Sequence, residues 1–175
     1  MSRVLVLGGS RSGKSAFAES LVAGRGDVTY LATSAGADDD AEWAARVAAH
    51  RARRPGAWTT LETTAPADLI RGGAVLVDSV TTWVAALMDE TGVWDADPDG
   101  DARRRLAGRC DALVNAWAMT PAHVVAVSDE VGLGVVPETR SGRLFRDTLG
   151  EVNQRLAGTA DEVWFVVAGL PQRLR

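Results

Sequence analysis

Short apolar runs alternate along the chain with longer amphipathic stretches, which is the pattern of a parallel sheet covered by helices. The runs are rich in valine and show no polar alternation, so we expect strands that are buried on both faces. The predicted strands are Val4–Leu7, Val28–Ala32, Ala74–Asp78, His123–Ser128 and Glu162–Ala168. The helices predicted between them are Ser15–Val22, Asp39–Arg54, Ala102–Met119 and Arg140–Ala157.

Two of the predicted helices carry an apolar stripe at helical spacing, which indicates packing against a core. The stripe of the helix 102–119 consists of Leu106, Cys110, Leu113 and Trp117. The stripe of the helix 140–157 consists of Phe145, Leu149, Val152 and Leu156. The stretch Thr91–Asp101 is rich in Gly, Asp and Pro and is predicted to be an exposed linker.

The composition limits the classes of protein that remain. A length of 175 residues fits one domain spanning residues 1–175. The net charge of −4 gives no positive field, so we expect no nucleic-acid partner. No apolar run approaches the roughly 18 residues of a membrane span. The first residues lead into a strand and a Gly-rich loop rather than a signal-peptide cleavage site, so we expect a cytoplasmic protein.

The first predicted strand leads into a loop that matches the phosphate-binding pattern G-x-x-x-x-G-K-[ST]. The loop consists of Gly8, Gly9, Ser10, Arg11, Ser12, Gly13, Lys14 and Ser15. Backbone N–H groups of such a loop surround an anion, and the N-terminus of the next helix adds its positive end. We expect Lys14 to reach the β- and γ-phosphates of a nucleotide and the Ser15 hydroxyl to hold Mg²⁺. The alternative is a glycine-rich turn without a ligand.

Lys14 is the only lysine of the chain, and the remaining 18 of its 19 basic residues are arginines. The ammonium group of lysine is a compact point charge, whereas the guanidinium group of arginine is a planar fork. A chain that uses arginine everywhere else therefore indicates that the phosphate loop requires lysine.

Polar residues also follow other predicted strands at their carboxyl ends, where ligands gather in open parallel sheets. These ends are Thr33-Ser34, Asp78-Ser79 and Ser128-Asp129-Glu130. Asp78 follows an apolar run and has the form of a Walker B carboxylate, which holds Mg²⁺ or its water shell. A cap at the end of a strand is the other interpretation of Asp78. Asp129 and Glu130 form a candidate second acidic pair.

The predicted helix Asp39–Arg54 ends in a cluster of basic side chains. Arg46, His50 and Arg54 are four residues apart and therefore share one face. Neighbouring guanidinium groups oppose protonation of an imidazole, and a neutral imidazole can attack phosphorus. An arginine-rich last turn that complements the helix dipole is the simpler interpretation, and the segment alone favours it. The other histidine, His123, begins a buried strand and is interpreted as structural.

Five segments spread along the chain resemble one known family. They are Leu7–Ser15, Tyr30–Ser34, His50 with Arg54-Pro55, Asp129–Glu138 and Val152–Leu156. Together they resemble the bifunctional adenosylcobinamide kinases/adenosylcobinamide-phosphate guanylyltransferases of cobalamin biosynthesis. The block from Glu130 to Pro137 is much more specific than the phosphate loop, which many NTPases share. The likeness continues to Ala168-Gly169-Leu170 and covers essentially the whole chain.

The resemblance implies a RecA-like P-loop NTPase fold, α/β with a mainly parallel sheet flanked by helices, assembled as a homotrimer. It implies that ATP or GTP, with Mg²⁺, phosphorylates adenosylcobinamide. GMP is then transferred from GTP to that phosphate through a guanylylated histidine, giving adenosylcobinamide-GDP and pyrophosphate.

The resemblance also implies roles for individual residues. It assigns the guanylylated histidine to His50 and makes Lys14 the second catalytic residue, within the phosphate loop 8–15. The implied metal ligands are Ser15 and Asp78. The residues that it adds to the GTP site are Thr33, Ser34, Arg51, Ala52, Arg53, Arg54, Glu62 and Asp78.

Two other functions fit the same motifs. A plain P-loop small-molecule kinase would transfer only a γ-phosphate and would carry no covalent nucleotide. A non-enzymatic nucleotide-sensing module would expose a large apolar patch for its partner. The chemistry of Lys14 and Asp78 makes the sensing module the weaker of these alternatives.

Overall fold

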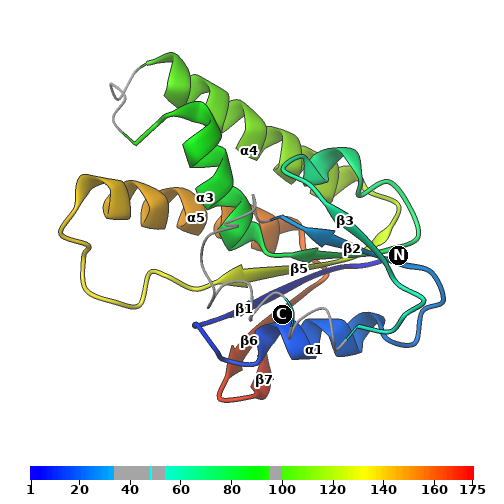
Figure 1. Ribbon diagram of the computed structural model, residues 1–175. Coiled ribbons are helices and arrows are strands. Elements are labelled where there is room, and N and C mark those ends of the chain that lie inside the picture. Colours follow the sequence, from blue (N-terminus) through cyan, green and yellow to red (C-terminus); the bar gives the residue numbers. More distant parts are fainter. Residues whose placement is uncertain (34–47, 49–53, 95–99) are drawn as a thin grey trace.

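The computed structural model describes residues 1–33, 48, 54–94 and 100–175, and they build one seven-stranded sheet (Figure 1). The strand order is β3-β2-β4-β5-β1-β6-β7. The strands are β1 (Arg3–Gly8), β2 (Val28–Ala32), β3 (Thr59–Glu62), β4 (Ala74–Asp78), β5 (His123–Asp129), β6 (Glu162–Val167) and β7 (Leu170–Arg173). All neighbouring strands are parallel except β6 and β7, which form an antiparallel hairpin. The carboxyl ends of β1 to β6 therefore lie at one edge of the sheet.

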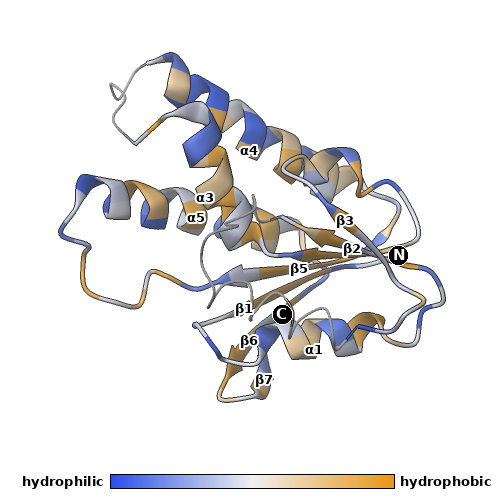
Figure 2. Cartoon of the chain, in the orientation of Figure 1, coloured by the Kyte–Doolittle hydropathy of each residue, from blue (hydrophilic) through white to orange (hydrophobic). Residues whose placement is uncertain are grey.

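Helices cover both faces of this sheet (Figure 1). The helix α1 (Lys14–Val22) lies on one face, and α3 (Val80–Thr91), α4 (Asp101–Met119) and α5 (Arg140–Thr159) lie on the other. Each face has its own apolar core, and the strands in the middle of the sheet, between these cores, are mostly apolar (Figure 2). The predicted α/β class, a mainly parallel sheet flanked by helices, is confirmed. Across the described ranges, no helix has the length and apolar character that crossing a membrane requires.

The structure adds elements that the sequence pattern did not predict. The strand β3 extends the sheet at one edge, and all four of its residues are exposed. The helix α3 begins directly after β4, where Ser79 and Thr82 form a reciprocal capping box. The short strand β7 closes the opposite edge, and a 3₁₀ turn, Pro66–Asp68, lies between β3 and β4.

The prediction of an exposed linker over residues 91–101 is wrong for the residues at its start. Thr91 is the last residue of α3 and is buried, and its hydroxyl donates to the carbonyl oxygen of Leu87 at 2.8 Å. Val93 is fully buried in the core between the sheet and the three helices. A valine next to a helix C-cap glycine is thus part of the core, although polar residues surround it in the sequence.

The helix predicted for residues 39–54 falls almost entirely outside the described residues. Only Ala48, which is helical, and Arg54, which lies in a bend, are described. For Arg54 the prediction is therefore wrong, because Pro55 disfavours the helical conformation of the residue before it.

Candidate active site

The phosphate loop runs from the end of β1 to the start of α1 and is tightly closed. Gly13 caps α1 in the left-handed region with φ 92°, and Arg11 also has a positive φ of 56°. The backbone N–H of Ser12 donates to the carbonyl oxygen of Gly9 at 3.2 Å. The turn between β6 and β7 supports the loop from outside, because the Gly169 N–H donates to the Ser12 carbonyl at 2.8 Å. The backbone thus has the curvature that an anion cradle requires.

Gly8 allows this curvature because a side chain there would collide with two neighbours. A Cβ on Gly8 would lie 2.5 Å from the Ser12 Oγ and 2.6 Å from the carbonyl oxygen of Val166. Gly8→Ala is expected to lower the free energy of unfolding by about 1–3 kcal/mol, the usual cost of overpacking. The measurement is urea unfolding of the variant and the wild-type protein.

Gly9→Ala is the matched control for this prediction. A Cβ on Gly9 meets no heavy atom within 4 Å among the described residues. Equal stability of the Gly8→Ala and Gly9→Ala proteins would contradict the proposed collision.

Lys14 lies folded over the loop and forms an ion pair with Asp129. Its Nζ lies 2.5 Å from the Asp129 Oδ1 and donates to the Gly9 carbonyl oxygen at 3.2 Å. Asp129 is the last residue of β5 and pairs with Gly8 across the β1–β5 ladder. Only 12% of the lysine side chain is exposed, so this ammonium is held inside the edge of the sheet.

Asp78 and Ser15, the predicted metal ligands, lie together at this edge. The Ser15 hydroxyl donates to the Asp78 Oδ1 at 3.4 Å, and the Tyr30 hydroxyl donates to the Asp78 Oδ2 at 2.5 Å. Burial raises the pKa of Tyr30 well above its ordinary value, and the adjacent Asp78 carboxylate raises it further. Tyr30 therefore stays protonated and fixes the carboxylate from the side opposite Ser15.

Tyr30 is the only tyrosine of the chain, so its ionisation can be followed alone by the ultraviolet absorbance of phenolate. In denaturant it is expected to titrate near a pKa of about 10, and in the folded protein no phenolate is expected until the chain unfolds. Because the folded pKa is the higher one, this group leaves stability unchanged below about pH 10 and lowers it as the pH rises further. Phenolate formation at the same pH in folded and denatured protein would contradict the contact with Asp78.

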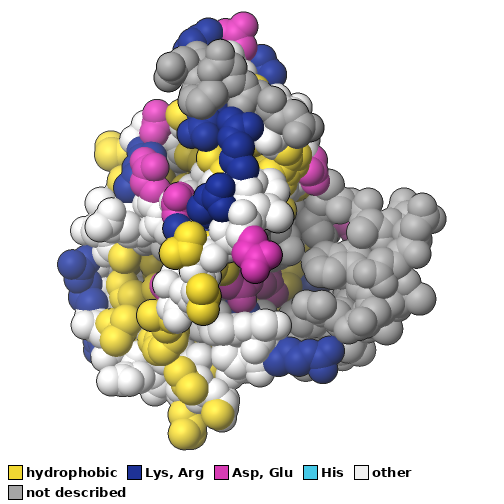
Figure 3. Space-filling view, turned by 90° about the vertical axis from the view of Figure 1, so that its left-hand side faces the viewer, with side chains coloured by type: hydrophobic (Ala, Val, Ile, Leu, Met, Phe, Trp, Pro, Cys, Tyr) yellow, Lys and Arg dark blue, Asp and Glu magenta, His cyan; other side chains and the backbone are white. Residues whose placement is uncertain are grey.

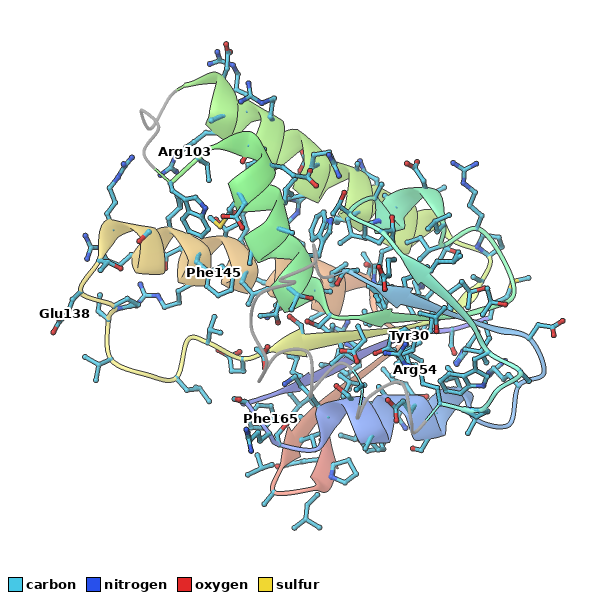
Figure 4. The ribbon with its side chains drawn as sticks, in the orientation of Figure 1. Tyr30, Arg54, Arg103, Glu138, Phe145 and Phe165 are labelled. Carbon is cyan, nitrogen blue, oxygen red and sulfur yellow. The ribbon has the colours of Figure 1, made fainter. Side chains whose placement is uncertain are left out.

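Arg54 lies beside Tyr30, the residue that holds Asp78, and also contacts the edge strand β3. Its guanidinium carbon lies 3.3 Å from the centroid of the Tyr30 ring, and its Nη1 donates to the Thr60 hydroxyl at 3.3 Å. Figure 4 shows Arg54 and Tyr30 side by side. Tyr30 thus lies between Asp78 and Arg54, a predicted GTP-site residue, and contacts both.

Two other predicted residues lie farther from the loop. The Thr33 hydroxyl donates to the Ser79 carbonyl oxygen at 2.5 Å, and Thr33 is fully buried. Thr33 therefore joins the end of β2 to the start of α3. Glu62 ends the edge strand β3, four strand spacings from β1, which is about 19 Å at the usual spacing. Glu62 is thus well separated from the phosphate loop along the sheet.

The remaining predicted site residues lie outside the described part of the chain. They are Ser34, His50, Arg51, Ala52 and Arg53. Figure 3 faces the edge at which the described site residues gather and shows acidic side chains near its middle, with basic ones around them.

A family model described as cobinamide kinase / cobinamide phosphate guanyltransferase matches residues 4–174. The chain belongs to this family, CobU. The match extends from β1 to β7 and so includes every residue of the phosphate loop, Asp78 and Asp129.

Curated relatives agree with the CobU family over nearly their full length. The bifunctional adenosylcobalamin biosynthesis protein CobU of Salmonella typhimurium is 42% identical, covering 98% of this chain and 99% of that protein. CobU of Escherichia coli gives the same identity and coverage. The bifunctional protein CobP of Pseudomonas aeruginosa is 40% identical, covering 99% of this chain and 97% of that protein. The resemblance predicted from the five sequence segments is confirmed.

A solved structure confirms the predicted RecA-like P-loop class. A prototypical ATPase from the type III secretion system of pathogenic bacteria aligns with 98% of this chain at a TM-score of 0.59. The CobU-family chain spans 56% of that ATPase, and the sequence identity is 13%, so the likeness concerns the fold alone.

Tyr30 and Asn153 are site residues that the sequence reasoning missed in this CobU-family chain. The Asn153 Nδ2 donates to the Asp129 carbonyl oxygen at 3.0 Å, and Asn153 is buried on α5. A signal existed, because Asn153 is four residues after Leu149 and so lies on the apolar face of its helix. A buried asparagine on such a face needs a polar partner.

Proposed function

We propose that this chain phosphorylates adenosylcobinamide with ATP or GTP and then transfers GMP from GTP to the new phosphate. The products of the second reaction are adenosylcobinamide-GDP and pyrophosphate. The observation that carries the proposal is the grouping of Lys14, Ser15 and Asp78 at one sheet edge of a CobU-family chain. These three side chains supply the phosphate contact and the oxygen ligands that transfer from a nucleoside triphosphate requires.

In the proposed kinase reaction, the phosphate loop binds the triphosphate and Lys14 leaves Asp129 for the β- and γ-phosphates. The hydroxyl oxygen of adenosylcobinamide attacks the γ-phosphorus, and the bond to the bridging oxygen of the nucleotide breaks. Backbone N–H groups of residues 8–15 and the ammonium neutralise the charge that develops on the phosphate oxygens.

Ser15 and Asp78 fit the oxygen-ligand chemistry of Mg²⁺. Their side chains lie 3.4 Å apart, and both present the oxygen donors that this ion prefers. In the part of the chain that the structure describes, no three His, Cys, Asp or Glu side chains gather as a metal site. The remaining ligands would therefore be phosphate oxygens and water, as is usual for nucleotide-bound Mg²⁺. When bound, the ion neutralises charge on the phosphates.

In the proposed guanylyl transfer, a nitrogen of His50 attacks the α-phosphorus of GTP and pyrophosphate leaves. The phosphate of adenosylcobinamide phosphate then attacks the same phosphorus, the P–N bond breaks and free His50 returns. The residues proposed to complete the GTP site are Thr33, Ser34, Glu62, Asp78 and the run 51–54. Support comes from Arg54, which follows His50 by four residues and contacts Tyr30 next to Asp78.

Two labelled forms of GTP test the proposal. With adenosylcobinamide and Mg²⁺, γ-labelled GTP is expected to label the corrinoid, which reports the kinase reaction. With protein and Mg²⁺ alone, α-labelled GTP is expected to leave an acid-labile, alkali-stable label on the protein. Transfer of the γ label without any α label would identify a plain P-loop kinase, and neither label would exclude both reactions.

We further propose that residues 1–175 act as one domain, that three copies assemble and that the enzyme works in the cytoplasm. The topology of the sheet supports a single domain. The N-terminal strand β1 lies between β5 and β6, which come from the C-terminal part of the chain. Exposed apolar side chains on the loop after β5, namely Leu133, Val135 and Val136, support an assembly that covers them. Sedimentation equilibrium of the purified protein tests the trimer.

A further inference from the structure

Three carboxylates, those of Asp78, Asp129 and Glu130, lie at or next to the carboxyl ends of the neighbouring strands β4 and β5, and each has a different partner. Both oxygens of Asp78 accept hydrogen bonds, one from Ser15 and one from Tyr30. The Glu130 Oε1 accepts from the backbone N–H of Gly132 at 2.6 Å, so this side chain is turned onto its own loop. Asp129 is the carboxylate that faces the phosphate loop and pairs with its lysine.

The backbone of Asp129 is held by two helices, α3 and α5, that lie on the same face of the sheet. Its N–H donates to the Thr81 hydroxyl on α3 at 2.7 Å, and its carbonyl oxygen accepts from the buried Asn153 on α5 at 3.0 Å. The ladder with β1 places it beside Gly8. Three elements thus fix the backbone of Asp129, and its side chain, 24% exposed, starts from a fixed position, as a reacting group requires.

The position of Asp129 relative to Lys14 places it near the γ-phosphate. Its Oδ1 lies 2.5 Å from Nζ, the atom that contacts the β- and γ-phosphates when a nucleotide is bound. A carboxylate beside phosphate oxygens weakens nucleotide binding, because like charges at a few ångströms repel. A carboxylate at this position therefore calls for a role in the reaction. An attacking hydroxyl needs an acceptor for its proton within hydrogen-bond reach, and the Asp129 carboxylate beside the phosphate-loop lysine is a side chain of that kind.

We propose that Asp129 accepts the proton of the adenosylcobinamide hydroxyl in the kinase reaction. As the hydroxyl oxygen forms its bond to the γ-phosphorus, the O–H bond breaks and its proton moves to the Asp129 carboxylate. The bond between the γ-phosphorus and the bridging oxygen breaks, and the nucleoside diphosphate leaves with that electron pair. Asp129 then returns the proton to solvent. This inference rests on the proposed function and assigns it a catalytic base.

Asp129→Asn tests the base because it keeps the shape of the side chain and removes its charge. The expected result is a 10²- to 10⁴-fold loss of kcat for γ-phosphate transfer, the usual contribution of general base catalysis. Nucleotide affinity is expected to be unchanged or higher, since Lys14 no longer has a competing partner. Labelling of the protein by α-labelled GTP is expected to stay within threefold of wild type.

Asp129→Glu separates a positioned base from a charge that only neutralises Lys14. The longer side chain can still pair with Lys14 but moves its oxygens by one methylene, so a 10- to 100-fold loss of kcat is expected for a base. The control is Asp68→Asn, which removes an exposed carboxylate that pairs with Arg71 and should leave kcat unchanged.

The outcomes separate this inference from the proposed function. A wild-type protein that does not transfer γ-phosphate to adenosylcobinamide refutes the proposed function itself. An active wild-type protein with kcat retained within threefold in Asp129→Asn refutes the base and leaves Asp129 as a partner of Lys14. Loss of kcat at saturating nucleotide in both Asp129 variants, with α labelling kept, supports the inference.

Discussion

Replacing Lys14 with alanine is expected to abolish nucleotide binding and, with it, both group transfers. The ammonium supplies charged hydrogen bonds to phosphate, each worth about 1.5–3 kcal/mol. The substitution also removes the partner of the Asp129 carboxylate, which lies 2.5 Å from the Lys14 Nζ in the wild-type protein. The negative charge of Asp129 then repels the bound phosphates without compensation. We expect affinity for ATP and GTP to fall by at least about 100-fold, which corresponds to about 2.8 kcal/mol. Calorimetric titration with each nucleotide measures this change.

Two variants control for charge and for side-chain shape. Arg25→Ala removes an exposed positive charge beyond the other end of α1 and should leave affinity unchanged. Lys14→Arg keeps the charge but replaces a compact ammonium with a planar fork, so it should remain strongly impaired. Wild-type affinity in Lys14→Ala would mean that the loop does not hold the nucleotide as proposed. Circular dichroism of each variant establishes that the fold is intact.

The fold could be predicted from the sequence where the signal is local. Eight consecutive residues define the phosphate loop, and valine-rich runs such as Ala74–Asp78 define buried strands without reference to distant partners. The carboxyl ends of parallel strands then had to share an edge, which brought Ser15 and Asp78 together as expected.

Of the missed elements β3 and α3, only the strand lacked such a local signal. The strand β3 reads Thr-Thr-Leu-Glu and is exposed throughout, so only its pairing with β2 makes it a strand. The helix α3 did carry a local signal that the sequence reasoning did not use, because its buried residues Val80, Trp83, Val84, Leu87 and Met88 follow helical spacing. The Ser79–Thr82 capping box was the available indication of its start.

The contacts within the site could not be predicted because they join distant parts of the chain. Tyr30 and Asp78 are separated by 48 residues, and Lys14 and Asp129 are farther apart still. Motif spacing identified Lys14 and Asp78 individually. It carried no information on Tyr30, whose side chain is interpretable only once β2 and β4 are known to be neighbours.

Replacing His50 with alanine is expected to abolish the α label on the protein and leave γ-phosphate transfer intact. A nucleotide bonded to nitrogen needs an accessible imidazole, and the chain has two histidines. His123 is excluded by its position: it begins β5, whose far end is Asp129, and six residues of strand span about 20 Å. His50 precedes Arg54 by four residues, and four residues reach at most about 14 Å. Arg54 itself contacts Tyr30 beside Asp78.

The matched control for this prediction is His123→Gln, which should keep the α label. His123 is 7% exposed, its Nδ1 lies 2.6 Å from the Ser2 hydroxyl, and burial lowers its pKa, so it is a neutral structural side chain. His123→Gln is therefore expected to lose some stability but no guanylyl transfer. Label that persists in His50→Ala would move the covalent step to another residue. Label lost equally in both variants, with the fold intact, would contradict the separate roles of the two histidines.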